Sequence, residues 1–261
     1  MDLGLKGKVA AVSGASQGIG YAIALGLAAE GANISISARG KERLDRAVKD
    51  LEAKGVAALG VQCDLSSPEG CEKFIAETVA RLDRLDILVN NVGGMIPGTL
   101  ETISEDAWKD IINRNLMSYL WCTRAAIPHL KRRPRAKILN VSGLTGKQLL
   151  PGSLSTTIPN IAIIGFSKLM AAELAPPGIT VNNICPGIVN TEVWGPRSEA
   201  MAKVRNMTAE QVRKMMTDLT LLGRWAEPHE IADVATFLLS ERNNYMTGTT
   251  VEVCGGWGRY M

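Results

Sequence analysis

The chain has 261 residues, and its 29 Lys and Arg against 26 Asp and Glu give a formal net charge of +3. This near-balance argues against a nucleic-acid-binding protein, which would carry a concentrated positive surface. Apolar residues make up 46% of the chain and charged residues 21%, as in water-soluble globular proteins. Because no apolar stretch resembles a signal peptide or a membrane span, we expect a cytoplasmic protein without a membrane partner.

Three rare residue types narrow the possible chemistry. The five cysteines are never spaced as CxxC, and only two histidines occur, so we expect neither a disulfide framework nor a metal site. The four tyrosines leave few candidates for a reaction that needs a phenol.

Short runs rich in β-branched residues alternate with longer segments of helical period. Strands are predicted at 9–13, 33–37, 57–63, 87–90, 137–141, 180–184 and 249–253. Helices are predicted at about 18–30, 42–54, 68–81, 104–132, 159–174 and 228–239. The alternation indicates βαβ units around a parallel sheet, in one α/β domain over residues 1–261. Methionines spaced through 194–218 favour helix packing in that segment.

A glycine-rich loop follows the first predicted strand. Residues 14–20 read Gly-Ala-Ser-Gln-Gly-Ile-Gly and lead into a helix. Glycines at these places let the backbone turn sharply and approach a pyrophosphate, which the positive end of the helix favours. The loop therefore predicts a dinucleotide site.

The same loop has a rival interpretation, since residues 14–18 also match the GxSxG pattern of a hydrolase nucleophile. That chemistry needs a histidine from a loop after a late strand, and His129 and His229 both fall in or beside predicted helices. We therefore favour nucleotide binding.

The end of the second strand indicates which dinucleotide is bound. It reads Ile36-Ser37-Ala38-Arg39-Gly40, with no carboxylate to bind the ribose hydroxyls of NAD. An arginine at this point can pair with the 2′-phosphate of NADP. Arg39 thus favours NADP(H) over NAD(H).

Further motifs follow in order: Asp64 after the third strand, Asn-Asn-Val-Gly at 90–93, Asn115 in the long helix, Lys168 in the next helix, and Pro-Gly-Ile-Val-Asn-Thr at 186–191. With these motifs the chain resembles the short-chain dehydrogenase/reductase family over about residues 6–256. The resemblance implies a doubly wound Rossmann fold with a seven-stranded parallel sheet, helices on both faces, and a homotetramer or dimer. It also implies a cofactor site formed by Gly14, Ser16, Gln17, Gly18, Ile19, Gly20, Arg39, Asp64, Leu65, Asn91, Val92, Gly93, Lys168, Pro186, Gly187, Val189 and Thr191.

The chain departs from the family's catalytic set of Asn, Ser, Tyr and Lys. Four residues before Lys168, where the family's tyrosine would stand, is Ile164. Gly143 stands at the serine position, with Ser142 one residue earlier, and residues 147–159 look like a loop that is either an insertion or a rebuilt active-site wall. We therefore expect an atypical member lacking the catalytic tyrosine, with Asn115, Ser142 and Lys168 as its catalytic residues. Tyr260 in the tail is a candidate acid for a neighbouring subunit.

Three functions remain open at this point. The first is hydride transfer between NADP(H) and a carbonyl or secondary alcohol, such as a 3-oxoacyl compound or a cyclic ketone. The second is lyase, isomerase or decarboxylase chemistry on the same fold. The third is a non-catalytic nucleotide-binding subunit.

Overall fold

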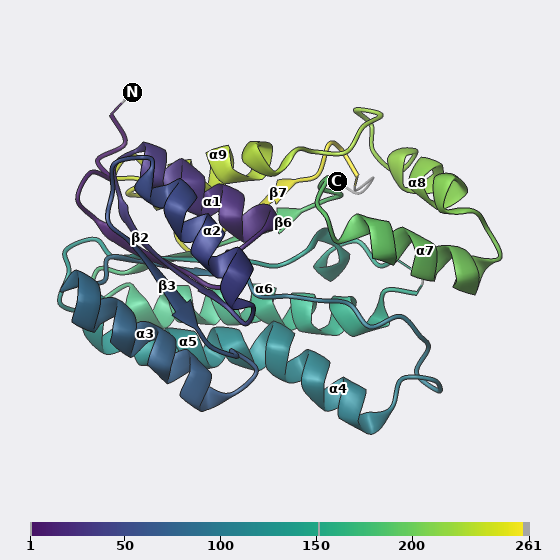
Figure 1. Cartoon of the computed structure of the whole chain (residues 1–261), viewed down its shortest axis with the longest axis horizontal. Coiled ribbons are helices and arrows are strands. Elements are labelled where there is room, and N and C mark those ends of the chain that lie inside the picture. Colours follow the sequence, from purple (N-terminus) through teal and green to yellow (C-terminus); the bar gives the residue numbers. More distant parts are fainter. Residues whose placement is uncertain (1, 151, 258–261) are drawn as a thin grey trace.

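A parallel sheet of seven strands forms the centre of the computed structural model, which describes residues 2–150 and 152–257. The strand order is β3-β2-β1-β4-β5-β6-β7, as expected of a doubly wound fold (Figure 1). The strands are β1 (Val9–Val12), β2 (Asn33–Ala38), β3 (Ala58–Gln62), β4 (Ile87–Asn90), β5 (Lys137–Val141), β6 (Thr180–Pro186) and β7 (Thr250–Val253). The predicted fold class is confirmed.

Helices cover both faces of this sheet (Figure 1). One face carries α1 (Gly18–Ala29), α2 (Lys41–Glu52) and α9 (Pro228–Leu239), and the other carries α3 (Pro68–Leu82), α5 (Ser118–Leu130) and α6 (Leu154–Leu174). The remaining segments are α4 (Glu105–Ile112), the π-helical turn η1 (Asn113–Met117), the 3₁₀ turn η2 (Leu144–Gly146), α7 (Trp194–Arg205) and α8 (Ala209–Thr217).

The two faces bury separate apolar cores because side chains alternate along each strand. In β1, Ala10 and Val12 pack with Ile23 and Leu27 of α1, while Ala11 packs on the opposite side. These central strands are buried on both faces, and this explains their nearly continuous apolar sequence.

One predicted helix and one predicted loop differ from the structure. The helix predicted from Pro159 begins at Leu154, so Pro159 lies inside α6. Proline is most common at the first position of a helix, and that preference placed the predicted start too late. Residues 154–159 belong to α6, so the loop expected at 147–159 is wrong over these residues.

No helix within residues 2–150 and 152–257 combines the length and apolar character needed to cross a bilayer.

Candidate functional site

A cavity of about 460 Å³ opens at the carboxyl ends of the strands. Its walls come from the loops after β1 to β6 and from α6, α7 and α8. Ligands of open α/β sheets bind in this crevice, because the strand order reverses there beside β1. Most predicted cofactor residues line it: Gly14, Ser16, Gln17, Gly18, Ile19, Arg39, Asp64, Leu65, Asn91, Val92, Gly93, Pro186, Gly187, Val189 and Thr191. Of the predicted catalytic residues, Asn115 and Ser142 line it.

The glycine loop presents the open end of α1 to this cavity. Gly14 and Gly18 have φ angles of 61° and 63°, a conformation that favours glycine. The N-cap residue Gln17 makes no side-chain capping bond to the helix. The first N–H groups of α1, which have no partner inside the helix, can therefore donate hydrogen bonds to a bound anion.

Gly20 has a different role from the one predicted, since it lies outside the cavity lining. A Cβ at Gly20 would come 2.3 Å from Asn91 Nδ2. That amide donates to the carbonyl oxygens of Ser13 and Gly14, both at 3.1 Å. Gly20 thus allows Asn91 to hold the glycine loop.

Charged residues gather at the far end of the cavity, after β2 and β3. Asp64 Oδ1 accepts hydrogen bonds from the Ser66 backbone N–H (3.0 Å) and hydroxyl (2.9 Å). Partial burial raises the pKa of Asp64, but these bonds and the charges of Arg39 and Arg114 outweigh it and hold the pKa below its usual value. Arg43 donates to the side chain of Gln17, and sequence reasoning missed this second cation near the glycine loop.

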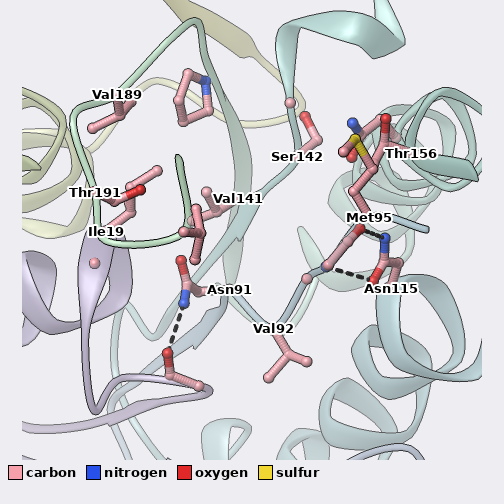
Figure 2. Close-up of a pocket in the computed structure, with 18 of the residues that line it drawn as sticks. Ile19, Asn91, Val92, Met95, Asn115, Val141, Ser142, Thr156, Val189 and Thr191 are labelled. Atoms are coloured by element: carbon pink, nitrogen blue, oxygen red, sulfur yellow. Dashed lines mark hydrogen bonds between the residues drawn. The ribbon is translucent and has the colours of Figure 1, made fainter. Parts of the chain in front are cut away.

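Asn115 fixes the segment after β4. It lies in the π-helical turn, is 5% exposed, and exchanges two hydrogen bonds with the backbone of Gly94, at 2.9 and 2.8 Å (Figure 2). Single π-helical turns occur frequently at functional sites. Its side-chain amide therefore shapes the wall formed by residues 93–95.

Ser142 lies on the same side of the cavity as Asn115 in Figure 2, and its hydroxyl makes hydrogen bonds within the protein. Its Oγ accepts from Asn183 Nδ2 at 2.9 Å and lies 3.0 Å from Cys185 Sγ. Burial raises the pKa of the Cys185 thiol. These contacts connect the Ser142 side chain to Asn183 and Cys185 of β6.

One face of α6 forms the wall beside Ser142. Ser153, Thr156, Asn160 and Ile163 line the cavity, and their spacing of three or four residues places them on a single helix face. Asn160 Nδ2 donates to Thr145 Oγ1 at 2.9 Å, and the Thr156 hydroxyl donates to the Ser153 carbonyl at 2.9 Å. Sequence reasoning missed Thr156 and Asn160 as a pair because it began the helix at Pro159.

Lys168 lies elsewhere, and its predicted place beside Asn115 and Ser142 is wrong. It is exposed, and a Cβ on Gly248 would lie 3.3 Å from its Nζ, beside the segment that enters β7. Strands enter a parallel sheet at the edge opposite their carboxyl ends. Lys168 is also eight residues beyond Asn160, about 12 Å along the helix at 1.5 Å per residue. Ile164 likewise falls outside the lining.

Tyr119 is the tyrosine that lines the described part of the cavity, and its hydroxyl donates to the Val141 carbonyl at 2.7 Å. Burial raises the pKa of this phenol. Neither His129 nor His229 is among the described lining residues, as the rejection of a hydrolase requires. Tyr260 lies outside the described residues.

The cavity is covered by α7 and α8. Trp194, Arg197 and Met201 of α7 and Met216 of α8 line it, and the Arg197 guanidinium lies 5.0 Å from the centre of the Trp194 ring. Burial lowers the pKa of Arg197. This wall is therefore apolar apart from one cation.

Comparisons with known proteins agree with this geometry. A family model described as enoyl-(acyl carrier protein) reductase matches residues 14–258. A putative ketoacyl reductase of the granaticin polyketide synthase from Streptomyces violaceoruber is 34% identical, with 97% of this chain and 93% of the relative covered. A 3-oxoacyl-[acyl-carrier-protein] reductase from Staphylococcus aureus is also 34% identical, with coverages of 95% and 97%.

A solved structure gives the same result. The L-sorbose reductase of Gluconobacter frateurii, complexed with NADPH and L-sorbose, is 32% identical, covers 100% of both chains and has a TM-score of 0.94. The chain therefore belongs to the short-chain dehydrogenase/reductase family.

Proposed function

We propose that this protein is an NADP(H)-dependent oxidoreductase with an altered catalytic site, which acts on a carbonyl or secondary alcohol of the 3-oxoacyl or cyclic-ketone type. The proposal rests on one cavity that is lined by the open end of α1, Arg39 and Asn115 together. Relatives named as ketoacyl and 3-oxoacyl reductases, and the reductase solved with NADPH, support the same reaction class.

The residues present fit a dinucleotide phosphate. The uncapped N-terminus of α1 suits the diphosphate. The positive φ angles at positions 14 and 18 favour glycine, which places no side chain in the path of the diphosphate. Arg39, which lines the far end of the cavity, and Arg43, which donates to Gln17 of the glycine loop, suit a 2′-phosphate. When bound, the nicotinamide would supply or accept the hydride.

We infer that Thr156 and Asn160 occupy the positions of the family's tyrosine and lysine. Both line the cavity, and they are four residues apart on one face of α6, as that pair requires. Gly143 then replaces the serine. Of the family's four catalytic residues, this assignment keeps Asn115.

The altered residues can orient a substrate and are poor acids. Asn160 donates one hydrogen bond to Thr145, and its amide has a second N–H that can polarise a substrate carbonyl oxygen. Neither the amide nor the Thr156 hydroxyl releases a proton near neutral pH, whereas a phenol with a pKa near 10 can be tuned to do so. We therefore assign the proton of the alcohol product to water, and expect slow turnover.

A second candidate is a nucleotide-binding protein without redox turnover. It is favoured by one observation: among the described lining residues, the phenol of Tyr119 is hydrogen-bonded to a backbone carbonyl, and no lysine is present. Turnover separates the two candidates.

The test combines binding with a restored site. NADPH affinity is measured by nucleotide fluorescence, and oxidation of NADPH by absorbance at 340 nm over 3-oxoacyl thioesters and cyclic ketones. The triple variant Gly143→Ser/Thr156→Tyr/Asn160→Lys should raise turnover about 10²- to 10⁴-fold, the usual contribution of general acid catalysis. The matched control is Gly143→Ser/Thr156→Phe/Asn160→Lys, which has the ring without the hydroxyl.

The outcomes are distinct. NADPH binding with slow reduction, and a gain that needs the tyrosine hydroxyl, supports the proposal. NADPH binding without reduction in the wild type selects the second candidate. No binding of NADPH contradicts both.

A further inference from the structure

Arg197 is a cation without an anionic partner in a largely apolar part of the cavity. Across residues 2–150 and 152–257 its guanidinium makes no ion pair or hydrogen bond, and its contact is the face of Trp194. The spacing of Trp194, Arg197 and Met201 turns all three toward the cavity from one face of α7. Arg197 is half-buried. Because a partly buried charge without a counter-ion is unfavourable, a cation kept in such a place is a candidate ligand-binding group.

The ring of Trp194 contacts this guanidinium, and a second tryptophan ring packs against Trp194. The centres of Trp194 and Trp225 are 4.9 Å apart with an interplanar angle of 52°. On the other side, the Arg213 guanidinium lies 4.1 Å from the centre of the Trp225 ring. The result is a chain of contacts in the order Arg197, Trp194, Trp225, Arg213, in which Arg197 lines the cavity and the exposed Arg213 does not. A stacked guanidinium keeps its N–H fork free for a planar anion.

The other charges around the cavity do not neutralise Arg197. Among the described lining residues the acidic side chain is Asp64, which lies at the far end with Arg39. Arg114 also lines the cavity, and it is paired with Asp110. On and beside α7, Glu192 and Glu199 are exposed and outside the lining.

The surroundings of Arg197 define the rest of the ligand. Leu150, Met201, Met216 and Trp257 line the same cavity and belong to the apolar cluster of α7 and α8. Methionine side chains adapt to apolar ligands of differing shape. A ligand whose charged end binds Arg197 therefore has its apolar part against these apolar side chains.

We propose that Arg197 is a specificity-determining residue that binds the carboxylate of an oxo acid or hydroxy acid, with an apolar spacer between the carboxylate and the reacting carbon. The inference rests on the proposed function only in taking the substrate to be a carbonyl compound or alcohol. The two N–H groups of the fork pair with the two carboxylate oxygens.

Isothermal titration calorimetry tests the proposal on the full chain, with and without saturating NADPH. The probes are levulinate and its two next longer homologues, each paired with its uncharged methyl ester. The wild type should bind at least one acid about tenfold more tightly than its ester, the least expected of a charge-assisted pair. Arg197→Gln should reduce that ratio to about threefold or less, and Arg197→Lys should retain part of it.

Arg213→Gln is the matched control, because it removes the outer arginine of the same chain of contacts and should keep the full ratio. Equal binding of acids and esters by the wild type, no saturable binding of either, or equal loss in Arg197→Gln and Arg213→Gln would overturn the proposal. Circular dichroism of each variant establishes that it is folded.

A parallel titration with NADPH separates the cofactor from the substrate. Arg197→Gln should leave NADPH affinity within about twofold. If it weakens NADPH binding and keeps the preference for acids, Arg197 binds the cofactor diphosphate and the proposal is wrong. If acids are preferred but NADPH is never oxidised, the carboxylate site stands and the redox function fails.

Discussion

The side chain of Asn160 occupies the space that a side chain on Gly143 would need. A Cβ built on Gly143 would lie 2.7 Å from Asn160 Nδ2, closer than real Cβ contacts allow. Gly143 has φ −135° and ψ 155°, an extended conformation open to any residue, so the conflict is steric. A side chain at position 143 therefore requires the Asn160 amide to move or to be removed.

We therefore predict that Gly143→Ser lowers the free energy of unfolding by about 1–3 kcal/mol, as overpacking does. In an Asn160→Ala background the same change should cost about 0.5 kcal/mol or less, because the blocking amide is gone. Urea denaturation of the four proteins in this cycle measures the coupling. Gly165→Ser on α6 is the control, since nothing lies within 4 Å of a Cβ there. Equal costs in both backgrounds would refute the steric argument.

Replacing Ser142 is expected to lower the free energy of unfolding without changing the affinity for NADPH. Its hydroxyl accepts the hydrogen bond of Asn183 Nδ2, and the Oδ1 of that asparagine already has no partner among the described residues. Ser142→Ala should therefore lower the free energy of unfolding by about 1–3 kcal/mol. NADPH affinity should stay within about twofold.

Ser16→Ala is the comparison for Ser142→Ala. Ser16 lines the same cavity and has no side-chain hydrogen bond to the described residues, so its loss should leave stability unchanged and weaken NADPH binding. A Ser142→Ala protein of full stability whose reduction of carbonyl compounds is lost would instead support the catalytic role predicted from sequence.

The fold could be predicted from sequence because its signals are local. Each strand is a β-branched apolar run bounded by turn residues, and the first glycine loop stands directly after β1. Parallel strands end at one edge, so motifs after β1, β2, β3 and β4 had to meet. That reasoning placed Arg39, Asp64 and Asn91 in one cavity.

The cavity-lining face of α6 could not be predicted in the same way. Its position depends on where the helix starts, and Pro159 gave a misleading start signal. The periodicity of buried residues 155, 159, 163, 167 and 171 was the available evidence for an earlier start. Assigning the catalytic position to Lys168 in place of Asn160 keeps the sequence pattern plausible. It moves the assigned side chain eight residues, or about 12 Å, along the helix. Lys168 was misplaced for this reason.

A pH-dependent contribution to stability is expected at the start of α9. The Glu230 carboxylate accepts two hydrogen bonds from Arg224, each 2.7 Å, and a third from the Glu227 backbone N–H at 2.8 Å. These contacts lower the pKa of Glu230 from 4.5 to about 2. Since the folded pKa is depressed, the stabilisation is complete above about pH 4.5 and is lost as the pH falls to about 2.

Thermal melts of the wild type and Glu230→Gln should therefore differ by a constant amount from pH 5.5 to 8. The difference should close between pH 4.5 and 2. Arg224→Met should remove most of the same pH-dependent difference, because it removes the two side-chain hydrogen bonds. A gap that persists unchanged at pH 2 would contradict the ion pair as its source.

Coenzyme preference follows from the end of β2. Arg39 lines the cavity and lies in a segment without a carboxylate, which leaves a positive charge where NADP(H) carries its 2′-phosphate and NAD(H) a hydroxyl. Arg39→Ala should weaken NADPH about tenfold to hundredfold, as expected for loss of a charge-assisted contact, and change NADH affinity less than about threefold. Fluorescence titration with both nucleotides measures this difference.

Two arginines of α2 calibrate that result. Arg43 donates a hydrogen bond to Gln17 in the glycine loop, so Arg43→Ala should weaken NADPH binding less than Arg39→Ala does. Arg46 pairs with Glu42 on the same helix, so Arg46→Ala should leave the affinity for NADPH unchanged. This graded series follows distance from the loop, whereas a general effect of net charge would weaken NADPH equally in all three variants. An equal loss of NADH and NADPH in Arg39→Ala would place that arginine against a part of the nucleotide that both coenzymes share, and the preference for NADP(H) would then lose its physical basis.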